Sequence, residues 1–434
     1  MERLHKDYVM QKIKLPKIPA TYLPYISWAI VALICFVTYR AHPIHTPLTG
    51  DEPYYLGEVK YLADYGWYNS LSQGTSFAYN FLNFIFSKLM PVELYVSIKL
   101  FSALCFLLSS YVLLKILACF KNIDNETKYL ALIFFAFSFS GHSWLLLANA
   151  PNALFVLLGI LSLLKIKNNK GIAISGFLFF FAFIVKPIAL FYIPGILLFL
   201  FIDTNTNLIN RLKNCALFFT VFLGFFIIYH IPSYQRYGKL MLEDKNHYYE
   251  AEKRIESTLP ADQKSIYYEV YNPNKRVNVW KVTPDEVEEF KVKHPEIKLQ
   301  LSHSEYIKTH TKIWFSNFLE KIFLDLPWQI DQGMFYHKWS TVHKWITSFA
   351  IIKLVSLIVL LFCCYKEREF IATNRFLIAP TVYLSFLSLY LIAQLENGWL
   401  LASIPFIALP ILQYAQRKLS VLPILLAYVI VLFL

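Results

Sequence analysis

Charged residues are scarce in this chain. They make up 16% of its 434 residues, whereas a soluble domain usually has about 25%. Hydrophobic residues reach 57% and gather in long runs, and a bilayer needs about 20 mostly apolar residues for each helix. The composition and the runs exclude a set of soluble domains and predict an all-α polytopic membrane protein. Clear examples of the runs are Ile172–Val185, Ala216–Ile231, Ile351–Cys364 and Val421–Leu434.

Cysteine is also scarce, and its placement argues against a metal site. The chain has six cysteines, and all of them lie within or beside apolar runs. The adjacent Cys363 and Cys364 have no second cysteine pair or histidine cluster that would complete a metal site. We therefore interpret the cysteines as small packing residues. The six are Cys35, Cys105, Cys119, Cys215, Cys363 and Cys364.

The net charge of +12 lies almost entirely in short connectors between apolar runs, because the long polar segment 234–344 is nearly balanced. This distribution follows the positive-inside rule of membrane proteins and excludes a nucleic-acid-binding face. No small-residue cleavage site follows the first apolar run at 22–39, so we expect a retained first span and a cytoplasmic N-terminus. Alternation then places every basic connector inside. Their residues are Lys115, Lys121, Lys128, Lys165, Lys167, Lys170, Arg211, Lys213, Lys366, Arg368, Arg375, Arg417 and Lys418.

Counting apolar runs gives about eleven transmembrane helices in three parts. Residues 1–233 form an N-terminal transmembrane region whose first outer loop spans 41–91. Residues 234–344 form a small extracytoplasmic insert, and 345–434 form the last helices. Within the insert, alternation around Val277, Val279 and Lys281–Thr283 is typical of a strand, and Asp285–Lys293 has a helical pattern.

The first outer loop holds two adjacent carboxylates, Asp51 and Glu52. Pro53 favours the first turn of a helix, and Asp51 or Thr49 is suited to cap it. Downstream, Tyr54, Gly57, Glu58, Tyr61, Leu62 and Tyr65 recur every three to four residues. This spacing predicts an amphipathic helix along the membrane surface, with the carboxylates fixed at its start.

Two interpretations of these residues stay open. Asp51 could be only a helix cap and Glu52 a first-turn charge favoured by the helix dipole, or one carboxylate could be a general base for an incoming hydroxyl. The aromatics of the loop, including Tyr54 and Tyr55, fit an interfacial belt or a sugar-stacking surface.

Lysines near the ends of apolar runs are the other candidates. Lys186 follows Ile172–Val185 and precedes Pro187, which places it near the outer end of a span. It could snorkel to the headgroups, or it could hold a lipid phosphate and stabilise the charge that grows on it. Lys99 could do the same, although snorkelling is the interpretation we favour there. Arg236, just past another outer end, is a further candidate.

At these residues the chain resembles the GT-C membrane glycosyltransferases, in the branch of protein O-mannosyltransferases and lipid A aminoarabinose transferases. The outward Asp51-Glu52 pair after the first span carries most of the resemblance, together with the Lys186-Pro187 step. Other segments similar to the family are its surface helix and second span at Phe77–Leu104, its next outer turn at Asn149–Leu154, and its late outer turn at Asn397–Pro405.

The resemblance implies a GT-C-like bundle with amphipathic surface helices in the first outer loop. It implies transfer of a monosaccharide from a polyprenyl-phosphate donor to a hydroxyl of a lipid, glycan or protein, with inversion at the sugar. Asp51 would be the general base and Glu52 would orient the acceptor or the sugar, and Lys186 would engage the phosphate. Further substrate-binding candidates are Tyr54, Tyr55, Glu58, Lys99, Asn149, Asn152 and Arg236.

One departure from the family concerns metals. An Asp often stands where this chain has Asn152, so we expect no essential metal and no cofactor. The family implies a bacterial inner (plasma) membrane, with the active site facing outward among membrane lipids. Two rival functions remain open: a transporter or flippase for a lipid-linked sugar, and a non-catalytic scaffold that presents the insert to a partner.

Overall fold

The structure is a computed structural model of the whole chain. It describes residues 19, 21–41, 52–70, 77–139, 143–145, 147–166, 168–202, 206–237, 266–270, 278–282, 311, 350–374, 378, 381–385, 387 and 401–419. For some of these, including Pro53, Tyr54 and Arg236, only the backbone is described.

The described part of residues 1–89 forms a first long helix and two helices of the predicted outer loop. Helix α1 (Leu23–Ala41) occupies the predicted first span, α2 (Glu52–Ser70) begins at the second carboxylate, and α3 (Phe77–Leu89) follows. Pro53 lies in the first turn of α2, as its fixed backbone angle favours. The sequence therefore predicted these helix starts to within a residue or two.

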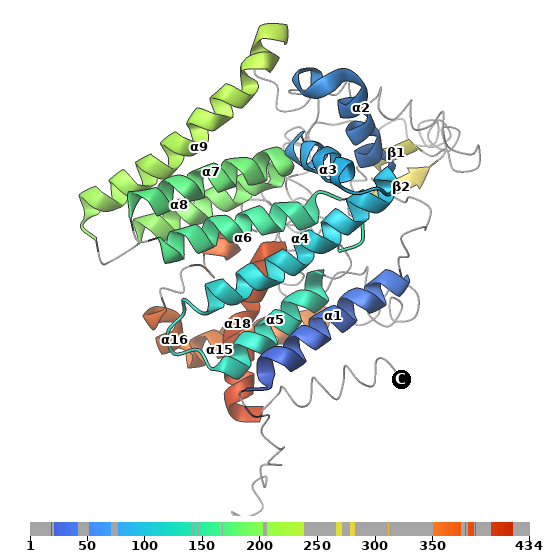
Figure 1. Cartoon of the computed structure of the whole chain (residues 1–434). Coiled ribbons are helices and arrows are strands. Elements are labelled where there is room, and N and C mark those ends of the chain that lie inside the picture. The colour runs from blue at the N-terminus through green and yellow to red at the C-terminus, as the bar shows by residue number, and fades with distance from the viewer. Residues whose placement is uncertain are drawn as a thin grey trace, which may run out of the picture.

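A bundle of longer helices makes up the centre of the molecule (Figure 1). Helix α4 packs on α6, α6 packs on α7, and α7 packs on α9. The bounds are α4 Leu94–Leu117, α5 Asn125–Phe139, α6 Asn149–Lys165, α7 Asn169–Val185, the 3₁₀ helix η2 Pro187–Tyr192, α8 Ile193–Phe201 and α9 Leu208–Tyr237. Because α9 continues through Pro232 to Tyr237, the helix runs past the boundary that the sequence suggested at 233.

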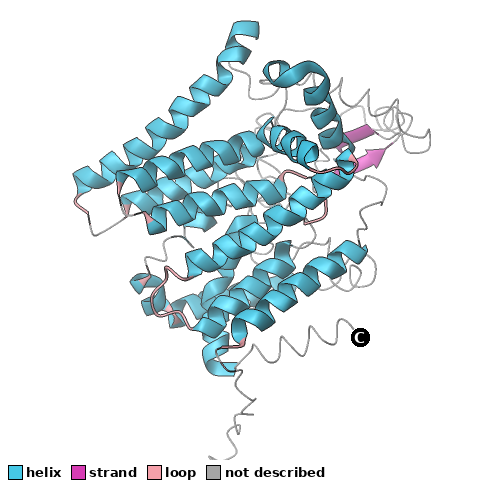
Figure 2. Cartoon of the chain, in the orientation of Figure 1, coloured by secondary structure: helices cyan, strands magenta, loops and turns pink. Residues whose placement is uncertain are grey.

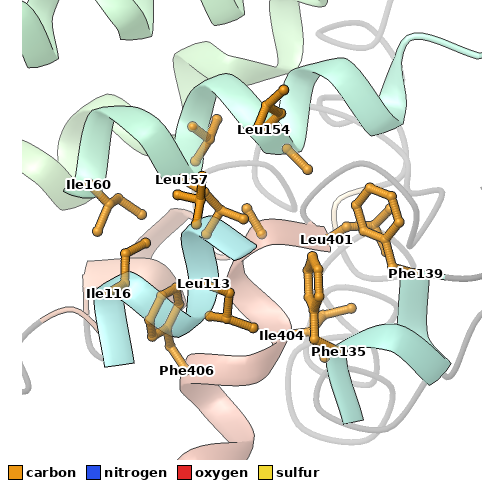
Figure 3. Close-up of a cluster of buried hydrophobic side chains, with 14 of the residues drawn as sticks. Leu113, Ile116, Phe135, Phe139, Leu154, Leu157, Ile160, Leu401, Ile404 and Phe406 are labelled. Atoms are coloured by element: carbon orange, nitrogen blue, oxygen red, sulfur yellow. The ribbon is translucent and has the colours of Figure 1, made fainter. Parts of the chain in front are cut away.

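The C-terminal helices join this bundle through apolar packing. They are α15 (Ala350–Lys366), α16 (Arg368–Thr373) and α18 (Ile404–Leu419), and α18 packs against α5. Figure 3 shows where side chains from α4, α5, α6 and the start of α18 meet in one core. The residues include Leu113, Phe135, Leu157 and Phe406, all of them buried. The early and late parts of the sequence thus share one hydrophobic core.

Apolar surface on the outside of the bundle identifies an integral membrane protein. Among the described residues, Leu94–Leu117 and Leu208–Pro232 are long and apolar enough to cross a bilayer. Only 17% of the apolar stretch of the second helix is buried, and side chains such as Phe219 and Ile228 are exposed. An apolar helix with so little burial belongs in lipid rather than in water. Four shorter apolar helices accompany these two, so the described residues do not establish the predicted count of eleven.

A pair of strands lies in the insert, where the sequence predicted a strand. In the insert, β1 (Ile266–Val270) pairs with β2 (Asn278–Val282) in antiparallel register, with Tyr268 opposite Trp280. Figure 2 shows the pair in magenta beside an otherwise helical molecule. The strand predicted around residues 277–283 is confirmed, whereas the helical segment Asp285–Lys293 and the apolar run Val421–Leu434 lie outside the described residues.

A polar network at one end of the bundle joins three of the predicted cytoplasmic connectors. Arg417 donates from Nη1 to Glu367 at 3.0 Å and from Nε to Asp124 at 3.3 Å. It also donates from Nη2 to the backbone oxygen of Asn122, a residue with φ 58°. These contacts come from the α4–α5 turn, the α15–α16 turn and the end of α18. The turns that hold Lys121 and Lys366 therefore lie at the same end as Arg417, as the charge pattern predicted.

Candidate functional site

Most of the predicted site residues lie at the opposite end of the bundle. The first turns of α2 and α6 supply Glu52 and Asn149. Lys99 lies in the second turn of α4, and Lys186 directly follows the last residue of α7. Asp51 lies outside the described residues. Tyr54 is in α2 and Arg236 is in α9, but neither side chain is described.

Glu52 and Lys99 form a buried pair of opposite charges. Glu52 is 3% exposed and Lys99 is 1% exposed, and the two charges interact. The expectation that Lys99 snorkels to the headgroups is therefore wrong. The attraction between these two charges favours keeping the start of α2 close to α4.

The buried face of α2 differs partly from the predicted one. Glu52, Tyr55, Glu58 and Leu62 are buried, and these positions follow helical spacing along one side. Tyr65 was predicted on that face but is exposed, and it stacks on Tyr61 with ring centroids 4.5 Å apart. Two carboxylates of α2, rather than its outer tyrosines, thus face the protein interior.

Tyr79 is a site residue that the sequence did not reveal. It is fully buried on α3, and its ring meets that of Tyr55 edge-on at 5.1 Å between centroids. Burial raises the pKa of its hydroxyl well above the ordinary value, and Tyr55 and Glu52 raise it further. The hydroxyl therefore stays protonated and remains a neutral hydrogen-bond donor. No local motif marked it, since a tyrosine in an apolar surface helix is usually interfacial.

Lys186 is held by an amide at the outer end of the bundle. Its Nζ donates to Oδ1 of Asn149 at 2.5 Å, and the side chain is only partly buried. The ammonium group is therefore fixed in position at the end of α7, with Asn149 supplied by the first turn of α6. A fixed, partly accessible cation at this place can receive an anion.

Asn152 has a structural role that the sequence did not predict. Its Nδ2 donates to the backbone oxygens of Ala182 at 2.9 Å and Lys186 at 3.2 Å. Helix α7 ends at Val185 because Pro187 cannot continue it. Both carbonyls also accept a backbone N–H, that of Ala182 from Lys186 and that of Lys186 from Ala189. Asn152 adds a second donor to each carbonyl and so ties α6 to the backbone that carries Lys186.

Comparisons with known proteins return matches to solved structures alone. No family model matches the chain, and no curated protein matches it. One similar structure is the Saccharomyces cerevisiae protein O-mannosyltransferase Pmt1-Pmt2 complex bound to the sugar donor, at 17% identity and TM-score 0.37, covering 58% of this chain and 40% of that one. Another is the archaeal oligosaccharyltransferase AglB from Archaeoglobus fulgidus in complex with an inhibitory peptide and a dolichol-phosphate, at 10% identity and TM-score 0.49, covering 93% and 52%.

Both similar proteins are members of the GT-C superfamily, the family that the sequence resembles. This chain spans about half of their length or less. With such low identities and TM-scores, the function proposed below rests on the residues of this chain.

Proposed function

We propose that the protein is a membrane glycosyltransferase that moves a monosaccharide from a polyprenyl-phosphate donor to an acceptor hydroxyl. The observation that supports this most is the gathering of charge at one end of an apolar bundle. There the buried Glu52–Lys99 pair anchors the helix that directly follows Asp51, and Lys186 is fixed by Asn149. A lipid phosphate needs cations at the membrane surface, and an attacking hydroxyl needs a base.

The chemistry assigns one role to each group. The acceptor oxygen forms a bond to the anomeric carbon, while the bond from that carbon to the phosphate oxygen breaks. The phosphate leaves with the electron pair, and its growing charge is stabilised by Lys186. The acceptor hydroxyl gives its proton to Asp51. Because the transition state resembles an oxocarbenium ion and the leaving phosphate needs no proton, one carboxylate base suffices.

Supporting roles follow from the positions of the remaining residues. The Glu52–Lys99 pair holds the first turn of α2 and therefore the backbone next to Asp51. Tyr55 and Glu58, buried on the same face of α2, border the sugar. Tyr54 and Arg236 complete the binding site around the donor, and inversion at the sugar is the outcome of a single displacement.

The site faces outward in this proposal, with the N-terminus in the cytoplasm of a bacterium and the chain in its inner membrane. The grouping of Arg417 with the turns after Lys121 and Lys366 at the opposite end supports this orientation, since basic connectors stay in the cytoplasm. The insert 234–344 then lies outside and helps to choose the acceptor, which is a lipid, a glycan or a protein.

The test is transfer by purified protein in lipid nanodiscs, with radiolabelled polyprenyl-phosphate monosaccharides as donors. Lys186→Met should raise the KM for the donor and lower turnover, because the phosphate is charged both in the ground state and in the transition state. Lys170→Met is the matched control, since Lys170 is an exposed lysine at the other end of the same helix. Consumption of no donor, or equal effects of the two substitutions, would overturn the proposal.

A further inference from the structure

Four buried polar atoms where α3 meets α4 have no hydrogen-bond partner among the described residues. They are Tyr79 Oη, Asn80 Oδ1, Asn83 Oδ1 and Ser102 Oγ, and none of these residues is more than 4% exposed. Buried polar groups in native proteins are normally paired, and leaving one unpaired is costly. We call these four residues the α3–α4 seam.

The sequence of α3 is arranged to keep this seam polar. Tyr79, Asn80 and Asn83 face inward, whereas Phe81, Ile85 and Leu89 are exposed. An amphipathic helix on a soluble protein has the reverse arrangement. Lipid at the membrane surface can cover the apolar outer face, but it gives no reason for polar side chains to face the protein. The inward polar face therefore needs a partner inside.

The seam adjoins the candidate site described above. Tyr79 contacts Tyr55 and lies within the electrostatic reach of Glu52. Ser102 lies one turn along α4 from Lys99, on the same side of that helix. Ser102 and Asn83 lie close enough to the Tyr79 hydroxyl to lower its pKa, although no hydrogen bond joins either of them to it. A ligand bound beside Glu52 and Tyr55 can thus extend to these atoms.

We infer that the α3–α4 seam is a subsite for the hydroxyl groups of a sugar ring, an inference that rests on the proposed function. The amide oxygens of Asn80 and Asn83 accept hydrogen bonds, and the hydroxyls of Tyr79 and Ser102 donate or accept. This set of neutral groups suits a polyhydroxylated ring, while the phosphate is left to the lysines. Since α3 has its opposite face exposed, it can admit the ring by shifting outward from its contacts with α2, α4 and α7.

The decisive comparison uses two serines of α4. Ser102 and Ser109 are both fully buried, and both have an unpaired Oγ, but Ser109 lies two turns further from the site. Ser102→Ala and Ser109→Ala should both fold with thermal midpoints equal to or above that of the natural protein, because each loses an unpaired buried hydroxyl. Only Ser102→Ala should weaken binding of sugar-bearing lipid, by about fivefold, the equivalent of one hydrogen bond.

Binding is measured in nanodiscs with farnesyl phosphate and with its glucosyl, mannosyl, galactosyl and arabinosyl derivatives. The inference predicts that Ser102→Ala leaves farnesyl phosphate binding unchanged and weakens at least one glycoside. Tyr79→Phe, which keeps the ring contact with Tyr55, should do the same. Unchanged glycoside binding, or equal weakening by Ser109→Ala, would overturn the subsite.

Further outcomes distinguish a donor sugar from an acceptor sugar, and failure of the subsite from failure of the proposed function. If only the binding of free malto-oligosaccharides weakens in Ser102→Ala, the donor-sugar subsite is overturned, and the seam binds sugar of an acceptor instead. If the natural protein binds neither farnesyl phosphate nor any of its glycosides, the proposed donor is wrong, and a donor-sugar subsite falls with it. If the natural protein binds the glycosides and the variants bind them equally well, the seam alone is refuted.

Discussion

Removal of Lys99 should destabilise the protein far more than removal of a surface lysine. Lys99 and Glu52 are 1% and 3% exposed and interact as opposite charges. Breaking a buried ion pair from one side leaves the other charge in a poorly solvated place and costs about 3–5 kcal/mol. We therefore expect Lys99→Met to lower the free energy of unfolding by about that amount. Glu52→Gln should lower it by less, because the flexible lysine that remains can reach toward the headgroups.

The double variant provides the sharper test. Replacing both members of a buried pair with neutral side chains of similar volume is often close to neutral. Lys99→Met combined with Glu52→Gln should therefore recover most of the stability lost in Lys99→Met alone. Equilibrium unfolding in mixed detergent micelles measures all three variants and gives the coupling energy.

Lys115→Met is the control for this cycle. Lys115 stands near the other end of α4 with its ammonium over the Tyr111 ring, 4.9 Å from the centroid, and such an exposed contact contributes about 0.5–1 kcal/mol. A Lys99→Met cost no larger than that of Lys115→Met would refute the buried pair. Additive effects of the Lys99 and Glu52 substitutions would do so as well.

Three shorter predictions concern hydrogen bonds at the two ends of the bundle and the orientation of the chain in the membrane. Asn152→Leu should destabilise the protein by about 1–3 kcal/mol, because two side-chain hydrogen bonds between α6 and the end of α7 are lost; an unchanged unfolding midpoint would contradict this structural role. Arg417→Met should cost about 1–2 kcal/mol, since the arginine is half exposed yet binds a buried carboxylate; no measurable cost would show that the network is incidental. Cysteines introduced at Ser72 and Ser265 should be labelled in intact cells, whereas one at Asn169 should stay protected; labelling of all three would invalidate the orientation.

The sequence was most informative where a local physical signal was strong. Apolar runs located α1, α7, α9 and α15, and Pro53 located the start of α2. The Lys186-Pro187 step predicted a helix end with a cation, because proline stops a helix whatever surrounds it. The alternation around Val279 predicted a strand. In each case a short segment of the sequence determines its own local structure.

Features that depend on contacts between distant segments could not be predicted. Lys99 looked like a snorkelling lysine because its partner, Glu52, lies far away in the sequence. Asn152 looked like a ligand in an outer turn, and its hydrogen bonds to the end of α7 depend on the packing of α6 against α7. Tyr79 had no distinguishing neighbours until α2 and α3 were placed together. The role of a side chain that contacts another helix depends on how the helices pack. The periodicity of the sequence does not encode that packing.

The most direct test of the proposed mechanism is the turnover of Asp51→Asn. Asparagine caps a helix about as well as aspartate but cannot take a proton from an attacking hydroxyl. With radiolabelled polyprenyl-phosphate sugar in nanodiscs, Asp51→Asn should fold and bind the donor normally yet lose about 10²–10⁴-fold in transfer rate. Near-normal transfer by Asp51→Asn, with Asp51→Ala losing only about 0.5–2 kcal/mol of stability, would show that Asp51 is a cap and would contradict the mechanism.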